Sequence, residues 1–132
     1  MKIIEKDGTR LALHFTEQDI QKGLGFFSED EEFIQVGTWR YDAGKNLQNH
    51  NHHLVERAVN RTQECIILLK GSLKTRVYDE EDNFIEEVTV RAHEGMIMLN
   101  GGHGYEILDD DTIVIECKNG PYPGAETDRR RF

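Results

Sequence analysis

The sequence predicts an all-β, antiparallel sandwich or barrel, and three features of the chain support this prediction. Short segments that alternate apolar and polar residues, or are apolar throughout, recur along its 132 residues. Polar or glycine-containing turns separate these segments, and only one stretch has the pattern of a helix. Closely spaced short strands with turns between them are typical of antiparallel sandwiches and barrels.

The predicted elements are short and belong to one domain. Strands are predicted at residues 10–15, 33–41, 64–69, 73–78, 84–90, 96–99, 105–108 and 112–118. One short N-terminal helix is predicted at 16–22, because Thr16 can cap its start and Gly23 can end it. No linker or repeat divides the chain. We therefore expect a single domain, 1–132, with a β core at about 33–120 and a C-terminal tail at 121–132.

The segment 65–69, Cys-Ile-Ile-Leu-Leu, is apolar at every position. Successive side chains of a strand point to opposite faces, so this strand is apolar on both of them. One face can fill the core, whereas the other needs a cover from an N-terminal strand or from a second subunit. We take this as an indication of a homodimer. Cys65 and Cys117 form no CxxC pair and are expected to be buried structural thiols.

Composition and charge limit the classes of function. Hydrophobic residues make up 37% of the chain and charged residues 31%, a balance typical of soluble globular proteins. No apolar run approaches the roughly 18 residues of a membrane helix, and the charged start lacks the apolar stretch of a signal peptide. We therefore expect a cytoplasmic protein with no membrane partner. A net charge of −9 argues against nucleic acid as a partner, because phosphate contacts need a basic face.

The residues that carry chemistry gather around three of the six histidines, in the run Asn49-His50-Asn51-His52-His53. Two histidines at positions i and i+2 of a strand point the same way, so His50 and His52 can direct both imidazoles to one ion. His53 would point the other way, so we expect it either to face solvent or to contact the metal ligands without binding the ion itself. This run is therefore the first half of a candidate metal site.

The glycines and histidines together resemble the motifs of the cupin family. The first family motif, G-x5-HxH-x3,4-E-x6-G, is matched by Gly44, His50, His52, Glu64 and Gly71. The second, G-x5-PxG-x2-H-x3-N, is matched at Gly95 and His103, but Asn100-Gly101-Gly102 stands in place of its Pro-x-Gly-x-x and Ile107 stands where its Asn is expected. Eleven residues, rather than three or four, separate His52 from Glu64. The resemblance covers roughly residues 39–120 and implies a cupin jelly-roll β-barrel or sandwich.

The resemblance also implies one divalent transition metal ion, with these ligands: His50, His52, Glu64 and His103. The residue types agree with it, since three imidazoles suit Fe, Mn, Ni, Cu or Zn, and a carboxylate completes a mixed shell that leaves open positions for water or substrate. The sequence does not choose among these metals.

Further residues are expected to act on a small-molecule substrate. The candidate catalytic residues are His50, His103, Glu64 and Tyr105. Tyr105 is either a proton donor or substrate contact, or a packed core tyrosine. Arg57 and Arg61 are candidates for binding a carboxylate or phosphate of the substrate, with solvated loop arginines as the alternative.

Three functions are compatible with these residues. The first is a metal-dependent enzyme that isomerises or oxygenates a sugar or small acid. The second is a metal-independent epimerase or isomerase of nucleotide-linked sugars, known among cupin relatives, in which His50 or His103 is the general base. The third is a module that binds a sugar or metabolite without turnover. A single cupin scaffold hosts many chemistries, so the fold does not choose among them.

Overall fold

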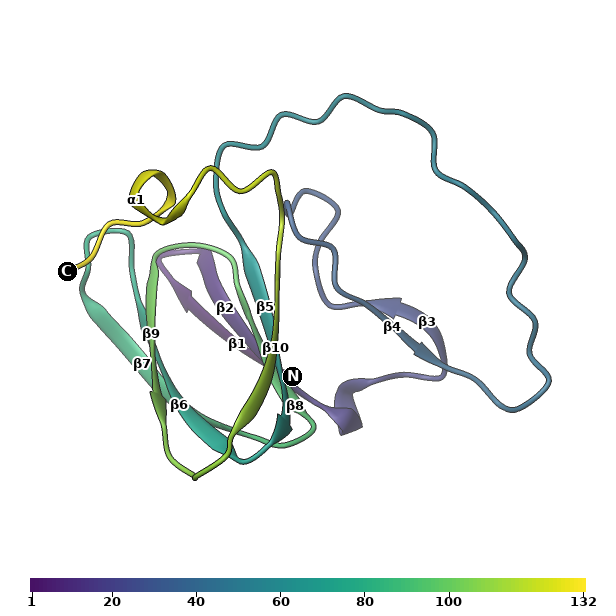
Figure 1. Ribbon diagram of the computed structural model, residues 1–132, viewed down its shortest axis with the longest axis horizontal. Helices are drawn as coiled ribbons and strands as arrows, with labels where there is room; N and C mark the ends of the chain where they lie inside the picture. Colours follow the sequence, from purple (N-terminus) through teal and green to yellow (C-terminus); the bar gives the residue numbers. More distant parts are fainter.

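The predicted all-β, antiparallel architecture is confirmed by the computed structural model, which describes residues 1–132. A five-stranded sheet has the order β1-β2-β8-β5-β10, and a three-stranded sheet has the order β7-β6-β9. These two sheets form a sandwich, and a separate hairpin, β3-β4, lies beside it (Figure 1). The sheets do not join into a closed barrel, but the arrangement is compatible with a jelly roll. No helix is long and apolar enough to span a lipid bilayer.

The strands run as follows: β1 Lys2–Lys6, β2 Thr9–Thr16, β3 Gly23–Phe26, β4 Gly37–Arg40, β5 Glu64–Lys70, β6 Ser72–Tyr78, β7 Phe84–Arg91, β8 Glu94–Met98, β9 Gly102–Ile107 and β10 Ile113–Lys118. A 3₁₀ turn, η1, spans Glu17–Asp19, and the one α-helix, α1, spans Ala125–Asp128. The alternating segments of the sequence thus became strands, whereas β1 and β3 were not predicted.

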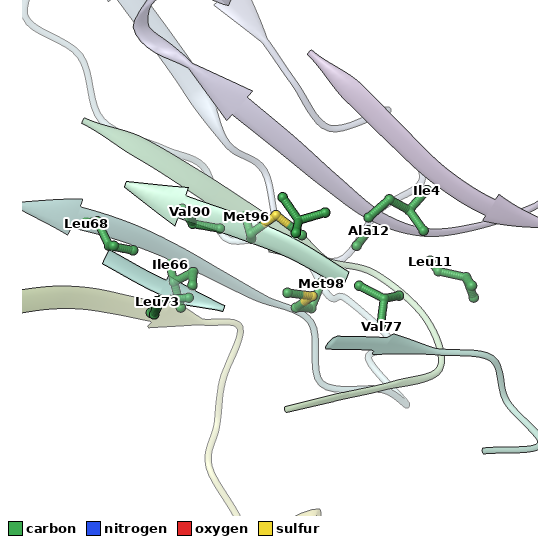
Figure 2. Packing of buried hydrophobic residues seen from close by; sticks show 11 residues of the cluster. Ile4, Leu11, Ala12, Ile66, Leu68, Leu73, Val77, Val90, Met96 and Met98 are labelled. Atoms are coloured by element: carbon green, nitrogen blue, oxygen red, sulfur yellow. The ribbon is translucent and has the colours of Figure 1, made fainter. Parts of the chain in front are cut away.

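The main core lies between the two sheets and follows from the alternation of the strands. On β6 the buried side chains are Leu73, Thr75 and Val77, and the residues between them are half-buried. The opposite sheet contributes Ile66 and Leu68 of β5, and Met96 and Met98 of β8 (Figure 2). Every second residue of each strand therefore points into the sandwich, as the period of two requires.

The five-stranded sheet is apolar on its outer face as well, as the run 65–69 predicts. Leu13, Cys65 and Ile97 point outward and are each at most 3% exposed. Their cover comes from the chain itself, because Phe27 and Ile34, between β3 and β4, pack on them. The cover stops short of the β10 edge, where the outward side chains, Ile113 and Ile115 among them, are exposed. The homodimer stays a prediction.

Of the helix predicted at 16–22, only the 3₁₀ turn Glu17–Asp19 forms, with Thr16 as its N-cap as expected. The Asp19 carboxylate accepts hydrogen bonds from the backbone N–H of Thr16 at 2.8 Å and from its hydroxyl at 3.2 Å, which closes a single turn. Ile20 then continues in an extended conformation and packs against the outer core. Burying Ile20 in this way competes with a helix too short to be stable by itself.

Two boundaries also differ from the sequence prediction. The strand predicted at 33–41 is only Gly37–Arg40, because Ile34 and Val36 pack over the sheet instead of extending β4. The five-stranded sheet includes β1 and β2, so the β core begins well before residue 33. Between β4 and β5, residues 41–63 form neither helix nor strand. Most of them run as a long, exposed arc outside the sandwich (Figure 1), whereas Gln63 at the end of the segment is buried.

Replacing Phe27 with alanine tests the intramolecular cover. Its ring contacts that of Phe15 at 4.8 Å between centroids and is 9% exposed, so Phe27→Ala is expected to lower the free energy of unfolding by about 2–4 kcal/mol. Phe26 is the matched control, because it is adjacent but 58% exposed, and Phe26→Ala should change stability by about 0.5 kcal/mol or less. Equal effects in urea denaturation would contradict this assignment of the cover.

Candidate functional site

The candidate site is a cavity of about 870 Å³ at the end of the sandwich where β5 begins and β10 ends. Its walls come from β5, β9, β10, the turn between β6 and β7, and the tail after residue 124. The lining is mostly polar and charged, and Glu64, His103, Tyr105 and Lys118 form its inner cluster. Strand alternation places all four on the inner face. Glu64 is two positions from the core residue Ile66, and Lys118 lies opposite Glu64. On β9, His103 and Tyr105 lie opposite the buried residues Val77 and Thr75 of β6.

Glu64 is the centre of this cluster and is only 4% exposed. Its Oε1 lies 2.7 Å from Nε2 of His103 and accepts a hydrogen bond from the Tyr105 hydroxyl at 2.9 Å. Its Oε2 lies 2.7 Å from Nζ of Lys118, the residue directly opposite on β10. A buried carboxylate is costly unless it is paired and hydrogen-bonded, and these three donors meet that requirement.

The same contacts set the ionisation of Glu64. Burial alone would raise its pKa, but the hydrogen bond and charge of His103, together with hydrogen bonds from Lys118 and Tyr105, outweigh burial and lower the pKa to about 2. Glu64 is therefore an anion at neutral pH. An ionised carboxylate only accepts hydrogen bonds, so the contact with His103 requires a proton on Nε2. The neutral imidazole then carries its lone pair on Nδ1.

The Tyr105 hydroxyl donates its hydrogen bond to the Glu64 carboxylate. Burial, the charge of Glu64 and the hydrogen bond to Glu64 all raise the pKa of the Tyr105 phenol. The phenol stays protonated and directs its O–H to Oε1 of Glu64. In this arrangement Tyr105 fixes the orientation of Glu64, and the ring also lies 5.2 Å from that of His103.

Lys118 belongs to this cluster but was not predicted as a site residue from the sequence. Burial lowers its pKa, but hydrogen bonds to Glu116 and Glu64 and the charges of both carboxylates raise it above the usual value. Its Nζ lies 2.7 Å from each carboxylate. The available signal was the alternation in β10, where Val114, Glu116 and Lys118 share the inward face. Its partner Glu64 lies 54 positions earlier in the sequence, and only the register of β5 with β10 brings them together.

The C-terminal tail forms the outer wall of the cavity. The Arg130 guanidinium binds both carboxylate oxygens of Asp82, at 2.8 Å and 2.6 Å, and Thr62 donates a hydrogen bond to Asp128. The Phe132 ring packs edge-on against Tyr78, with 5.1 Å between centroids. It also lies over Gly102, where an added Cβ would be 2.7 Å from Phe132 Cζ. Glycine at 102 thus permits the tail to lie against β9.

The predicted site residues divide into two groups. Glu64, His103, Tyr105 and Arg61 line the cavity, and Arg61 is paired with Glu80 at 2.9 Å. The others lie in the segment 41–63 outside it: His50, His52 and Arg57. His50 and His52 are exposed, and their rings lie edge to face at 5.2 Å between centroids. No strand forms there, so the alternation argument for a shared face does not apply to this pair.

The predicted metal ligands therefore do not come together in this conformation. His103 and Glu64 are in contact, but no group of three or more His, Cys, Asp and Glu side chains is arranged to hold a metal ion. To complete the predicted metal site, His50 and His52 would have to move to the cavity. The metal centre stays a prediction.

Comparison with known proteins adds no assignment. No protein-family model, no curated protein and no solved structure matches this chain. The cupin resemblance thus stands on the motifs alone, and the function is inferred from the geometry of the cavity.

The low pKa of Glu64 predicts a specific acid sensitivity. Because the pKa is about 2 in the folded state against an ordinary value of 4.5, ionised Glu64 stabilises the fold above pH 4.5, and this contribution is lost as the pH falls toward 2. Between pH 5 and pH 3 the free energy of unfolding should fall by about 2 kcal/mol more in the wild type than in Glu64→Gln.

Urea denaturation at a series of pH values measures this difference, and the variant corrects for all other carboxylates. Parallel pH profiles of the two proteins would show that Glu64 is not held as an anion by its three donors.

Proposed function

We propose that this protein is a metal-independent isomerase or epimerase that moves a proton next to a carbonyl group of a small polar substrate. The observation that carries the proposal is the contact of 2.7 Å between Nε2 of His103 and the buried carboxylate of Glu64, in the wall of a polar cavity. A histidine oriented by a carboxylate is a general base of the kind that enzymes use for proton abstraction.

His103 is assigned as the base. Glu64 holds the tautomer with a proton on Nε2, which leaves Nδ1 as the nitrogen that accepts a proton from substrate. The side chain is 30% exposed, so substrate can reach it, whereas Glu64 is shielded. After Nδ1 takes the proton, the imidazolium is stabilised by the adjacent carboxylate, and the same proton can return to the substrate at another carbon or face.

Lys118 is assigned to the oxyanion that forms when the carbon loses its proton. Its ammonium group has three donors, and two carboxylates, Glu64 and Glu116, occupy two of them. The third N–H remains for the substrate oxygen. Donors placed where negative charge develops are a large contribution to catalysis. Tyr105 is a positioning residue, because it acts through Glu64.

The lining indicates the class of substrate. Most of its side chains are polar or charged, and its aromatic residues are Tyr78, Tyr105 and Phe132. Such a cavity fits a sugar or a small hydroxylated acid better than an apolar compound. Arg129 and Arg131 of the tail suit an acidic or phosphorylated substituent, whereas Arg61 and Arg130 are already paired with Glu80 and Asp82.

The test is exchange of substrate protons with solvent. Keto sugars, nucleotide-linked keto sugars and small keto acids are incubated with the protein in deuterated water, with and without a chelator, and deuterium uptake is followed by NMR. We expect uptake that resists chelation, and a loss of about 10²- to 10⁴-fold in His103→Gln. His53→Gln, a change of an exposed histidine outside the cavity, is the matched control.

Exchange at the wild-type rate in His103→Gln would contradict the assignment of the base. Binding of a compound without exchange would instead favour the binding module.

A metal-dependent isomerase or oxygenase is the second candidate, favoured by the contact between two predicted ligands, Glu64 and His103. Residues 41–63 lead directly into Glu64, and Arg61 and Thr62 already line the cavity. A movement of this segment would be needed to bring His50 and His52 to it.

Metal analysis of protein purified without a histidine tag or added metal tests the second candidate. If the metal prediction holds, we expect about one transition-metal ion per chain, lost in the variant His50→Ala/His52→Ala. A protein that stays empty when Fe, Mn, Ni, Cu or Zn is offered would contradict it. His53→Ala serves again as the control in the same run of histidines.

A further inference from the structure

Two free cysteines face each other across β5 and β10. Cys65 and Cys117 are direct register partners in the antiparallel pair. Residues opposite each other in a sheet point to the same side, and both lie on the outer face, away from the cavity. Cys65 is 3% exposed, whereas Cys117 is exposed.

The hydrogen-bond pattern gives the separation expected between them. The backbone N–H of Asn119 donates to the carbonyl of Gln63 at 3.3 Å, which marks these opposed residues as a hydrogen-bonded pair. Such pairs alternate along an antiparallel ladder, so Cys65 and Cys117, two positions further on, form another. Cα atoms in a hydrogen-bonded pair lie about 5.5 Å apart, within the range of roughly 4.4–6.8 Å in which disulfides form.

We propose that Cys65 and Cys117 are a reversible redox site that forms a cross-strand disulfide. The exposed Cys117 thiolate attacks a low-molecular-weight disulfide such as oxidised glutathione, whose S–S bond breaks and releases one thiol. Burial and the neighbouring Cys117 raise the pKa of the Cys65 thiol to about 12, so Cys65 gives up its proton only as it attacks the sulfur of Cys117. This second step forms the intrachain bond and displaces the second thiol. The two cysteines are oxidised, the reagent is reduced to two thiols, and the two protons pass from the cysteines to the departing thiols.

The disulfide is expected to be strained and therefore easily reduced. Opposed Cβ atoms in a sheet lie about 4.5–5.5 Å apart, whereas a disulfide needs about 3.5–4.5 Å. Closing the bond draws the strands together by roughly 1 Å on the outer face. Strained or exposed disulfides have the higher reduction potentials that suit a regulatory role.

The neighbouring residue pair connects this site to the cavity. Glu64 and Lys118 are the next pair along the same two strands and point to the opposite face. A change in the spacing of the strands at Cys65 and Cys117 therefore displaces the carboxylate that orients His103. The redox site itself does not depend on the proposed proton transfer, since it stands on the register of β5 and β10.

Oxidation of the full chain with oxidised glutathione tests the proposal. We expect a product that retains no glutathione, has lost two hydrogens in mass, and yields a linked peptide containing Cys65 and Cys117 that dithiothreitol separates. Cys65→Ser should instead keep one glutathione on Cys117. Wild-type protein that keeps a glutathione on Cys117, or forms disulfide-linked dimers, would overturn the proposal.

The coupling to the cavity has its own measurement. NMR signals of the His103 ring should shift on oxidation of the wild type and return on reduction, and should stay unchanged when Cys117→Ser is treated in the same way. Signals that do not move in a fully oxidised wild type would overturn the coupling. That result would not decide whether His103 is a base, which the exchange experiment tests separately.

Discussion

The site depends on one constraint, which is the burial of the Glu64 carboxylate. An anion that is 4% exposed must find its compensation inside the protein. Glu64 of β5 finds it on two other strands, from His103 and Tyr105 on β9 and from Lys118 on β10. These strands belong to both sheets of the sandwich. The cluster therefore also fixes how the two sheets meet at the open end, where apolar packing gives way to the cavity.

The architecture that supports this cluster follows from a sheet with two apolar faces. The inner face of β5 packs into the main core, whereas its outer face is covered by the segment around Phe27 and Ile34. Because both sides are filled, β5 is rigidly placed between β8 and β10. Its first residue is Glu64, so the position of the carboxylate is set by packing over the length of the strand.

The strands could be predicted from the sequence because alternation is a local signal, and β6 shows it at every position. The helix predicted at 16–22 is shortened to the turn Glu17–Asp19, because burial of Ile20 outweighed a weak local preference. His103 and Glu64 were predicted as site residues because they match the family motifs, and Tyr105 because a tyrosine close to His103 can donate a proton. Lys118 was not, since its role depends on the register between β5 and β10. The shared face of His50 and His52 presumed a strand that the structure lacks.

The electrostatics of Glu64 bear on the choice between the two chemistries. Lys118 lies 2.7 Å from one oxygen, and Nε2–H of His103 lies 2.7 Å from the other. A divalent cation at this carboxylate would have to displace the ammonium group, because two cations on one buried carboxylate repel each other. It would also take the imidazole nitrogen that now carries a proton. A metal centre therefore requires the present network to break, whereas proton transfer at Nδ1 of His103 uses it as it stands.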